Sequence, residues 1–213
     1  MDRYAPPDVP LAVLHHDHEL LVMNKPAGLL SVPGKLPGLD DCLLARVRAA
    51  FPEALLVHRL DRDTSGVIVF ALTPRAQRHL SRQFEQRRSE KRYVARVAGR
   101  LDGSGTVDLP IATDMENRPR QKICLDRGRA AQTGWKVLAR EDGATRVALS
   151  PVTGRSHQLR VHMLAIGHPI LGDPLYAPDS AADHPRLMLH AEWLRLRHPD
   201  GGRFVDFTAP CPF

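Results

Sequence analysis

The residues best suited to chemistry lie in one short polar loop, His58–Gly66, where Asp61 stands between two arginines and Asp63 follows. A carboxylate beside guanidinium groups stays ionised, which suits a nucleophile or an electrostatic stabiliser better than a general acid. The alternative is structural: the two aspartates cap a turn that Thr64–Gly66 completes. For an isolated loop of this kind the structural interpretation is the more common one.

A second candidate is the segment Gly154–His162, in which a helix is predicted from about residue 156 to 166. Arg155 would then stand at the positive end of that helix, where anions bind. His157 and His162 are five residues apart, so they do not share a helix face well enough to form a metal-binding pair. The structural alternative is a surface helix whose histidines are hydrogen-bonded.

Two smaller clusters carry weaker signals. Tyr93, in the basic stretch Lys91–Ala95, could stack on a nucleic-acid base, although such a tyrosine is more often half-buried packing. His15–His18 has the composition of a metal cluster, but neighbouring residues of an extended segment point in opposite directions. This cluster is therefore predicted to be a solvated turn, and no metal site is expected.

Charge gives the first indication of a partner. The 213 residues carry a formal net charge of +6, and the stretch from Pro74 to Arg100 holds nine basic residues against two acidic ones. Eight of the nine are arginines. Because the guanidinium group forms forked hydrogen bonds to phosphate oxygens, this stretch favours a polyanionic partner, with RNA or DNA the first candidate.

Composition excludes several other classes. A content of 43% hydrophobic and 25% charged residues is typical of a globular protein of one domain. The longest apolar runs, such as Val67–Leu72, fall far short of the roughly 18 residues of a membrane span. The N-terminus lacks the pattern of a signal peptide. Three widely spaced cysteines indicate reduced thiols and a cytoplasmic location.

The hydrophobic pattern predicts more strands than helices, with little βαβ alternation. We therefore expect an α+β fold with a large, mainly antiparallel or mixed sheet flanked by helices. Asp40 or Asp41 is expected to cap the first helix and Thr73 the second. Residues 1–10 are expected to form a loose arm. The predicted strands cover 11–14, 20–24, 55–57, 67–72, 92–98, 135–140, 145–151, 190–197 and 204–208, and the predicted helices 41–50, 156–166 and a segment from 74 onward.

Taken together and in this order, four motifs resemble the RluA family of RNA pseudouridine synthases: Asn24–Leu30, His58–Gly66, Lys91–Ala95 and Gly154–His162. Within that family the chain is most similar to the dual-specificity members, which act on large-subunit ribosomal RNA and on tRNA anticodon stem-loops. The resemblance implies one catalytic domain over residues 11–213. It leaves no room before it for the S4 domain that many relatives carry.

The resemblance also implies roles for individual residues. Asp61 matches the catalytic aspartate, Tyr93 the active-site tyrosine that stacks on the base, and Arg155 the arginine that pairs with the aspartate. Arg59 matches a residue thought to help hold the flipped-out nucleotide. The other basic or histidine side chains of the motifs are expected to contact the RNA: His58, Lys91, Arg92, His157 and Arg160.

The implied activity is that of an isomerase that flips a uridine out of structured RNA before acting on it. Such a reaction needs no cofactor and no metal, and a cytoplasmic monomer is the default expectation. Two alternatives stay open. One is a non-catalytic RNA-binding module on the same scaffold. The other is a glycosidase that uses Asp61 together with Asp63, although nothing in the sequence fixes the carboxylate separation that such chemistry requires.

Overall fold

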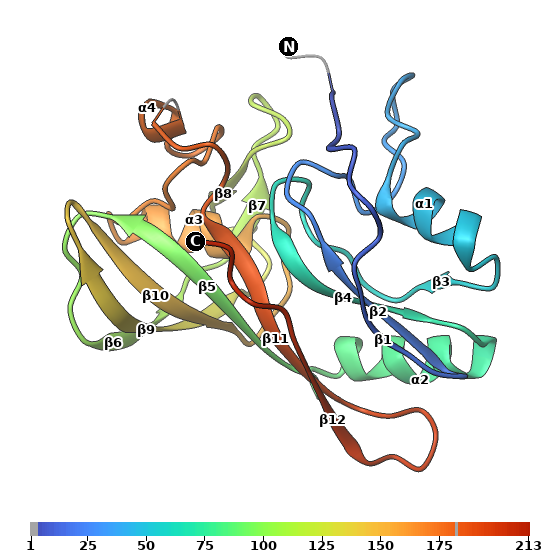
Figure 1. The fold of residues 1–213 in the computed structure, drawn as a ribbon. Helices are drawn as coiled ribbons and strands as arrows, with labels where there is room; N and C mark the ends of the chain where they lie inside the picture. The colour runs from blue at the N-terminus through green and yellow to red at the C-terminus, as the bar shows by residue number, and fades with distance from the viewer. Residues whose placement is uncertain (1–3, 182) are drawn as a thin grey trace. The chain divides into compact units, whose positions relative to one another are not determined.

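The computed structural model describes residues 4–181 and 183–213 of the chain. These residues form two compact units, between which the chain passes close to the start of strand β5 (Glu90–Ala98) and of strand β11 (Leu189–Arg197). The first unit comprises the chain up to Lys91 together with Ala191–Pro212, and the second comprises Arg92–His190 and Phe213. Strands dominate and helices are few, so the predicted α+β class is confirmed (Figure 1).

The first unit is a sheet with two helices. Its strand order is β1-β2-β4-β11; off this path, β12 pairs with β11 and β3 pairs with β4. The pairings β1–β2, β2–β4, β3–β4 and β11–β12 are all antiparallel. Besides β11, the elements of this unit are β1 (Val13–His16), β2 (Leu20–Lys25), α1 (Leu43–Ala50), β3 (Leu55–Leu56), β4 (Ser65–Ala71), α2 (Pro74–Glu85) and β12 (Phe204–Thr208).

The core of the first unit lies between this sheet and α2. All seven residues of β4 are buried, as expected for a strand that reads as a continuous apolar run. Ala76 and Leu80 of α2 pack against the sheet in the same hydrophobic cluster. The helix begins as predicted: the Thr73 hydroxyl accepts a hydrogen bond from the Ala76 amide at 3.1 Å, and Pro74 occupies the first helical position.

Two local predictions for this unit are wrong. Helix α1 is capped by the Cys42 sulfur, which accepts from the Ala45 amide, and not by Asp40 or Asp41. Asp41 instead forms a two-pronged ion pair with Arg46. Strand β1 runs two residues later than expected, into the histidine segment.

Of the arm predicted over residues 1–10, the first three residues lie outside the described part. The rest of the arm is irregular but anchored, because Tyr4 donates to the Asp41 carbonyl at 2.8 Å and accepts from the Leu30 amide at 3.0 Å.

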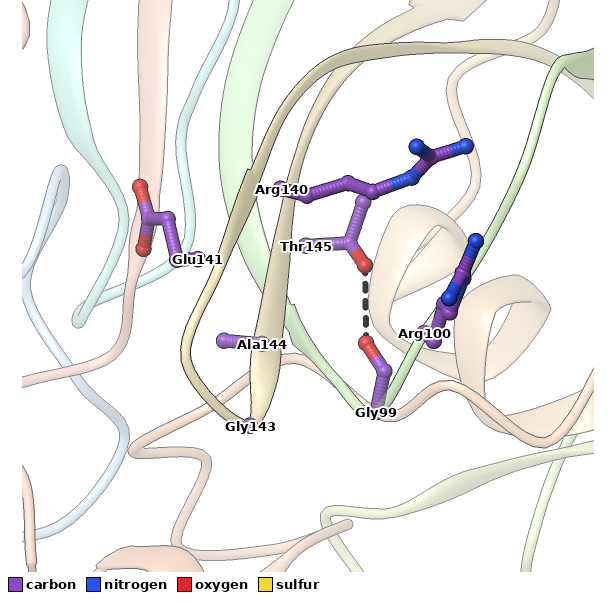
Figure 2. Close-up of a pocket in the computed structure, with 7 residues that line it drawn as sticks. All are labelled: Gly99, Arg100, Arg140, Glu141, Gly143, Ala144 and Thr145. Atoms are coloured by element: carbon purple, nitrogen blue, oxygen red, sulfur yellow. Dashed lines mark hydrogen bonds between the residues drawn. The ribbon is translucent and has the colours of Figure 1, made fainter.

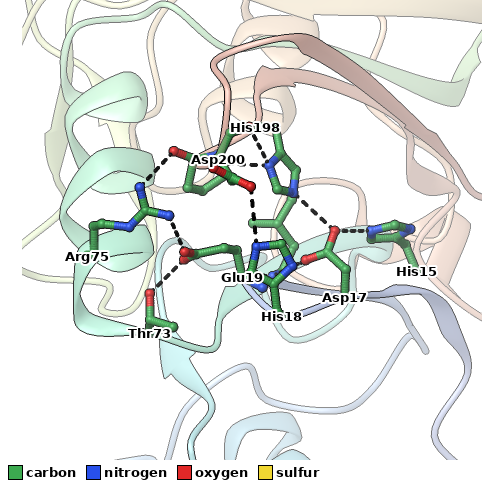
Figure 3. A network of polar contacts seen from close by, with 10 residues as sticks. His15, Asp17, His18, Glu19, Thr73, Arg75, His198 and Asp200 are labelled. Carbon is green, nitrogen blue, oxygen red and sulfur yellow. Dashed lines mark hydrogen bonds and ion pairs between the residues drawn. The ribbon is translucent and has the colours of Figure 1, made fainter.

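The histidine segment 15–18 leaves His16 and His18 exposed, as predicted, but Asp17 belongs to a network of polar contacts that was not predicted (Figure 3). The Asp17 carboxylate accepts from two backbone amides and lies within hydrogen-bond distance of the His15 and His198 rings. Glu19 is buried and hydrogen-bonded to Thr73 and Arg75 at the start of α2. The partners come from residues distant in the sequence, which a local pattern does not reveal.

The second unit contains a four-stranded sheet in the order β5-β10-β9-β6, in which all three pairings are antiparallel, and a small β7–β8 hairpin. The predicted hairpin around Gly143 is confirmed. The short elements β6, β7, β8 and α4 were not predicted. Besides β5, the elements are β6 (Ser104–Asp108), β7 (Ile111–Thr113), β8 (Gln121–Ile123), β9 (Gln132–Glu141), β10 (Ala144–Pro151), α3 (Gln158–Ala165) and α4 (Pro178–Ala181).

Helix α3 covers the core of the second unit. Leu159 and Met163 are buried in a cluster with residues of β5 and β10, as the amphipathic pattern predicts. The helix begins at Gln158, two residues later than expected, because His157 adopts a left-handed backbone conformation with φ of 55°. Among the helices of the described chain, none is long and apolar enough to cross a membrane.

Candidate active site

Asp61 lies in the first unit, on the loop that joins β3 to β4. The loop turns back at this residue, where the Thr64 amide donates to the Asp61 carbonyl at 3.2 Å. Thr64 is buried, whereas the aspartate is half-buried. The neighbouring carboxylate of Asp63 pairs with the Arg62 guanidinium at 2.8 Å and closes no turn. The two aspartates therefore have different surroundings. The backbone hydrogen bond between Thr64 and Asp61 closes the turn.

Two side chains from another part of the first unit fix the loop on both sides of Asp61. The fully buried Lys25 donates from Nζ to the carbonyls of Pro26, Leu29 and Arg62, at 2.8, 2.6 and 2.8 Å. The Ser31 hydroxyl donates to the Leu60 carbonyl at 2.7 Å and accepts from the Leu60 amide at 3.1 Å.

Sequence reasoning found the Asn24–Leu30 motif but assigned no role to these two side chains. Each of them bonds to the backbone of the residue beside Asp61, Ser31 on the preceding side and Lys25 on the following side. Lys25 of the motif and Ser31 directly after it thus fix the backbone on the two sides of Asp61. The sequence feature that could have indicated this role is a lysine at the end of a largely apolar strand.

The His58 ring makes its contacts inside the protein. Its Nε2 accepts from the Val69 amide at 3.1 Å, and the ring stacks on Phe84 of α2 with the centroids 4.4 Å apart. Burial, and after it the charge of Lys91, lowers the pKa of His58 to about 3. The imidazole is therefore neutral near pH 7, and its contacts favour a positioning role over a direct RNA contact.

The other basic residues predicted near Asp61 differ in exposure. Arg59 is exposed on the loop itself. Lys91 is half-buried, with its ammonium 5.9 Å from the centre of the Phe84 ring, and burial lowers its pKa. Arg59 is thus placed to meet a ligand from solvent, whereas Lys91 also contributes to packing.

Tyr93 and Arg92 follow in the second unit, at the start of β5. Tyr93 is half-buried and packs against the core of this unit, opposite Leu149 of β10. Arg92 is exposed. Because side chains alternate along a strand, these neighbours project to opposite faces of the sheet.

Arg155 lies in the second unit on the turn that precedes α3, not within the helix. Its Nε donates to the Ala130 carbonyl at 3.0 Å, and its amide donates to the Gln158 side chain at 3.0 Å. The same Gln158 oxygen accepts from the Thr153 hydroxyl at 2.7 Å. A buried glutamine therefore ties both ends of the turn together and fixes the backbone at Arg155.

His157 and Arg160 meet at the buried ring of Tyr176. His157 Nδ1 lies 2.8 Å from the Tyr176 hydroxyl, which also accepts from the Gln121 amide of β8 at 2.7 Å. The Arg160 guanidinium lies 5.0 Å from the centre of that ring and forms a two-pronged ion pair with Asp173, both contacts at 2.7 Å. Because the Arg160 side chain is only 3% exposed, it supports the turn from inside.

The histidines of this segment are hydrogen-bonded, as the structural alternative predicts, but the predicted surface helix is wrong, because residues 158–163 are all buried. His162 is buried and lies 2.9 Å from both the Thr133 hydroxyl and the Leu109 carbonyl. Burial lowers its pKa, so it is neutral near pH 7. Within the described residues, no group of three or more His, Cys, Asp or Glu side chains could hold a metal ion.

A cavity of about 270 Å³ lies in the second unit at the turn between β9 and β10 (Figure 2). Its wall includes Arg100 and Arg140, which share the Asp102 carboxylate. Thr145 closes one side by donating to the Gly99 carbonyl at 2.7 Å. None of the predicted site residues lines it, and it adjoins the end of β5 opposite to Tyr93.

The predicted site residues are thus divided between the two units. Asp61, its loop and the residues that hold the loop belong to the first unit, whereas Tyr93 and Arg155 belong to the second. Each unit presents its motif residues on turns and strand ends that buried hydrogen bonds hold in place. Such fixed, accessible positions are typical of functional groups.

Comparison with known proteins identifies the class to which this fold and these motifs belong. Residues 19–165 match the model of the RNA pseudouridylate synthase family. The chain belongs to this family, within its RluA group, and is an RNA pseudouridine synthase, an isomerase. The prediction made from the four motifs is confirmed at this level, and no finding favours the non-catalytic RNA-binding alternative.

Similar proteins match this chain over nearly its full length. The dual-specificity RNA pseudouridine synthase RluA of Escherichia coli strain K12 is 52% identical over 217 residues, which covers 100% of this chain and 99% of the relative. The protein of the same name from Yersinia pestis is 53% identical over 206 residues, covering 95% of this chain and 100% of the relative. Among solved structures, human RNA pseudouridylate synthase domain containing 1 aligns with a TM-score of 0.82 and 32% identity, over 98% of this chain and 87% of that one.

Proposed function

We propose that this enzyme isomerises uridines in two kinds of structured RNA, large-subunit ribosomal RNA and tRNA anticodon stem-loops, and that Asp61 is its catalytic group. The relatives that are about half identical over the full length are named dual-specificity enzymes, which supports two substrate classes. The observation that carries the catalytic assignment is the loop at Asp61, whose backbone is fixed on both sides by Ser31 and Lys25.

The proposed reaction moves one bond within a nucleotide. The bond between N1 of uracil and C1′ of the ribose breaks, the base rotates, and a bond forms between C5 and C1′. C5 loses its proton to solvent and N1 gains one, so atoms and charge balance without a co-reactant. An ionised aspartate can attack either the ribose or the base to start this sequence, which requires that the uridine first leave its stack.

Tyr93 and Arg155 are the proposed partners of Asp61. A half-buried tyrosine on a strand can stack on the extruded base and help to move a proton. A guanidinium can form a forked pair with a carboxylate and keep it ionised and aligned. Arg59, Lys91 and Arg92 are proposed to contact RNA, whereas contacts inside the protein favour positioning roles for the remaining three: His58, His157 and Arg160.

The same proposal includes a cytoplasmic location, a monomeric state and a single catalytic domain from residue 11 onward. Ribosomal and transfer RNA are made and processed in the bacterial cytoplasm, which supports the location. The three widely spaced cysteines fit the reduced thiols of that compartment.

The test is release of tritium from RNA labelled at uridine C5, because C5 loses its hydrogen only when the new carbon–carbon bond forms. We expect release from ribosomal and tRNA transcripts by the wild type and a loss of at least about a thousandfold in Asp61→Asn. Asp63→Asn is the matched control, since it removes the neighbouring carboxylate that pairs with Arg62. Equal losses in the two variants, or release of free uracil in place of isomerisation, would contradict the proposal.

A further inference from the structure

The outer side of helix α2 is a row of arginines. Arg75, Arg78 and Arg82 are spaced at i, i+3 and i+7, which places them along one side of a helix. The opposite side packs into the core of the first unit through Ala76 and Leu80. We define the arginine face as the exposed residues of this row together with the two arginines that follow the helix: Arg75, Arg78, Arg82, Arg87 and Arg88.

Most of this positive charge is not neutralised. Arg75 is paired with Glu19 (Figure 3) and also donates to the Pro199 carbonyl. In the part of the chain that the structure describes, no carboxylate lies within 4.0 Å of the guanidinium groups of the other four arginines. Elsewhere on the surface, arginines such as Arg195 are paired with an aspartate. An unpaired row of this kind is typical of a surface that binds phosphate.

The face also acts electrostatically on its neighbours. The pKa of His79, which lies beside the row on the same helix, is lowered by burial first and then by the charges of Arg75 and Arg82. Two guanidinium groups therefore raise the positive potential at a third side chain of this surface. That potential would attract any polyanion that approaches the helix.

The chemistry of the face favours RNA over an acidic protein. Protein interfaces are centred on exposed aromatic or aliphatic anchors, and the described residues of α2 and the turn after it contain no exposed large hydrophobic side chain. Phosphate groups need only positive donors at regular spacing. The 12 residues of α2 extend roughly 18 Å, which is long enough to face several phosphates of one strand.

The face points away from the catalytic loop. The inner side of α2 contacts the segment that leads to Asp61: Gln77 donates to the Leu56 carbonyl at 2.9 Å, and Phe84 stacks on His58. Arg75, Arg78 and Arg82 lie on the other side of the helix. A nucleotide held at Asp61 is therefore separated from these three arginines by the body of α2, and only RNA beyond the reacting nucleotide can reach them.

We propose that the arginine face of α2 binds phosphate groups of RNA outside the stem-loop that carries the target uridine. This inference rests on the proposed function and extends it, because it predicts that large RNA substrates are held by a surface that a minimal stem-loop does not use. Binding there raises the affinity for the RNA without taking part in the chemical step.

The test uses the full-length enzyme with Arg78→Gln and Arg82→Gln combined, two exposed positions at which the fold does not depend on the side chain. The matched control combines Arg140→Gln and Arg195→Gln, which removes the same charge from exposed arginines that are paired with aspartates. The substrates are a full-length large-subunit ribosomal RNA transcript and the isolated stem-loop around the uridine modified in it. Tritium release gives KM and kcat, and direct binding gives Kd as a function of salt.

For the long transcript we expect KM and Kd to rise roughly tenfold with kcat unchanged. The slope of log K against log salt should shrink by about 1.5, as expected for two lost phosphate contacts. The stem-loop and the control variant should show no change. The inference is overturned if the long transcript binds as before, if the stem-loop loses the same affinity, or if the control loses as much. Failure of the proposed function would appear differently, as absence of tritium release by the wild type.

Discussion

The two turns that carry Asp61 and Arg155 are held in place by different chemistry. In the first unit, the Lys25 ammonium and the Ser31 hydroxyl bond directly to backbone groups of the loop. In the second unit, the turn before α3 is closed by the Gln158 amide, and the helix behind it is held by the buried pair of Arg160 with Asp173. In the first unit a buried ammonium therefore donates to backbone carbonyls, whereas in the second unit a buried guanidinium pairs with a carboxylate.

This difference has energetic consequences. Removing either member of a buried ion pair leaves the other charge uncompensated, which costs about 3–5 kcal/mol. Removing the Lys25 ammonium leaves three neutral carbonyls without this donor, at about 1–3 kcal/mol each, and it also abolishes the several kcal/mol required to bury the ammonium. The second unit should therefore be the more sensitive to loss of its buried charge, although the first carries the aspartate proposed to be catalytic.

The largest effect is expected at Asp173. Asp173→Asn keeps the shape of the side chain but leaves the Arg160 guanidinium buried without a counter-charge, so we expect the free energy of unfolding to fall by about 3–5 kcal/mol. Asp206→Asn is the matched control, since Asp206 forms the same forked pair with the exposed Arg195, and its loss should stay within about 1 kcal/mol. Urea unfolding measures both. Similar losses would show that burial is not what distinguishes the two pairs.

A smaller loss is expected at Lys25. Lys25→Met removes three hydrogen bonds from buried carbonyls but also removes the cost of burying the ammonium, so the net loss should be about 2 kcal/mol. Because the Arg62 carbonyl adjoins Asp61, kcat should fall while KM changes little. The control is Lys136→Met, at an exposed position of β9. A variant that keeps full kcat despite its lower stability would show that Lys25 does not position the aspartate.

Much of the fold was predictable because local patterns dominate in it. The Thr73-Pro74 start of α2 and the buried strand β4 each carry a local signal that tertiary contacts reinforce. The strands β6, β7 and β8 were missed because they are short and of weak pattern. The α1 cap was misassigned because Asp41 has a stronger partner in Arg46. The enclosure of Glu19 depends on residues more than fifty positions away, which local patterns do not encode.

The site was predictable in a different way. Asp61 stood out by its own loop, whereas grouping it with Tyr93 and Arg155 depended on the family resemblance, because the three residues are distant in sequence and divided between two units. The supporting side chains were not predicted at all. A buried lysine on carbonyls and a tyrosine shared by His157 and Arg160 arise only when distant segments meet.

Per pH unit, the smallest effect is that of acid on the first unit, through His58. The pKa of His58 is about 3 in the folded protein, against an ordinary value of 6.5. Below pH 6.5 the imidazole is therefore protonated in the unfolded chain but stays neutral in the folded protein. The stabilisation is complete above pH 6.5 and is lost as the pH falls toward 3, with a slope of at most about 1.4 kcal/mol per pH unit from this residue. Carboxylates titrate mostly below pH 5, so they add little to the slope between pH 7 and 5.

The free energy of unfolding, measured over that pH range, should show a shallower slope in His58→Gln than in the wild type. No such change is expected in His16→Gln, which alters an exposed ring. An unchanged slope in His58→Gln would mean that the ring beside Phe84 accepts a proton without disturbing the loop.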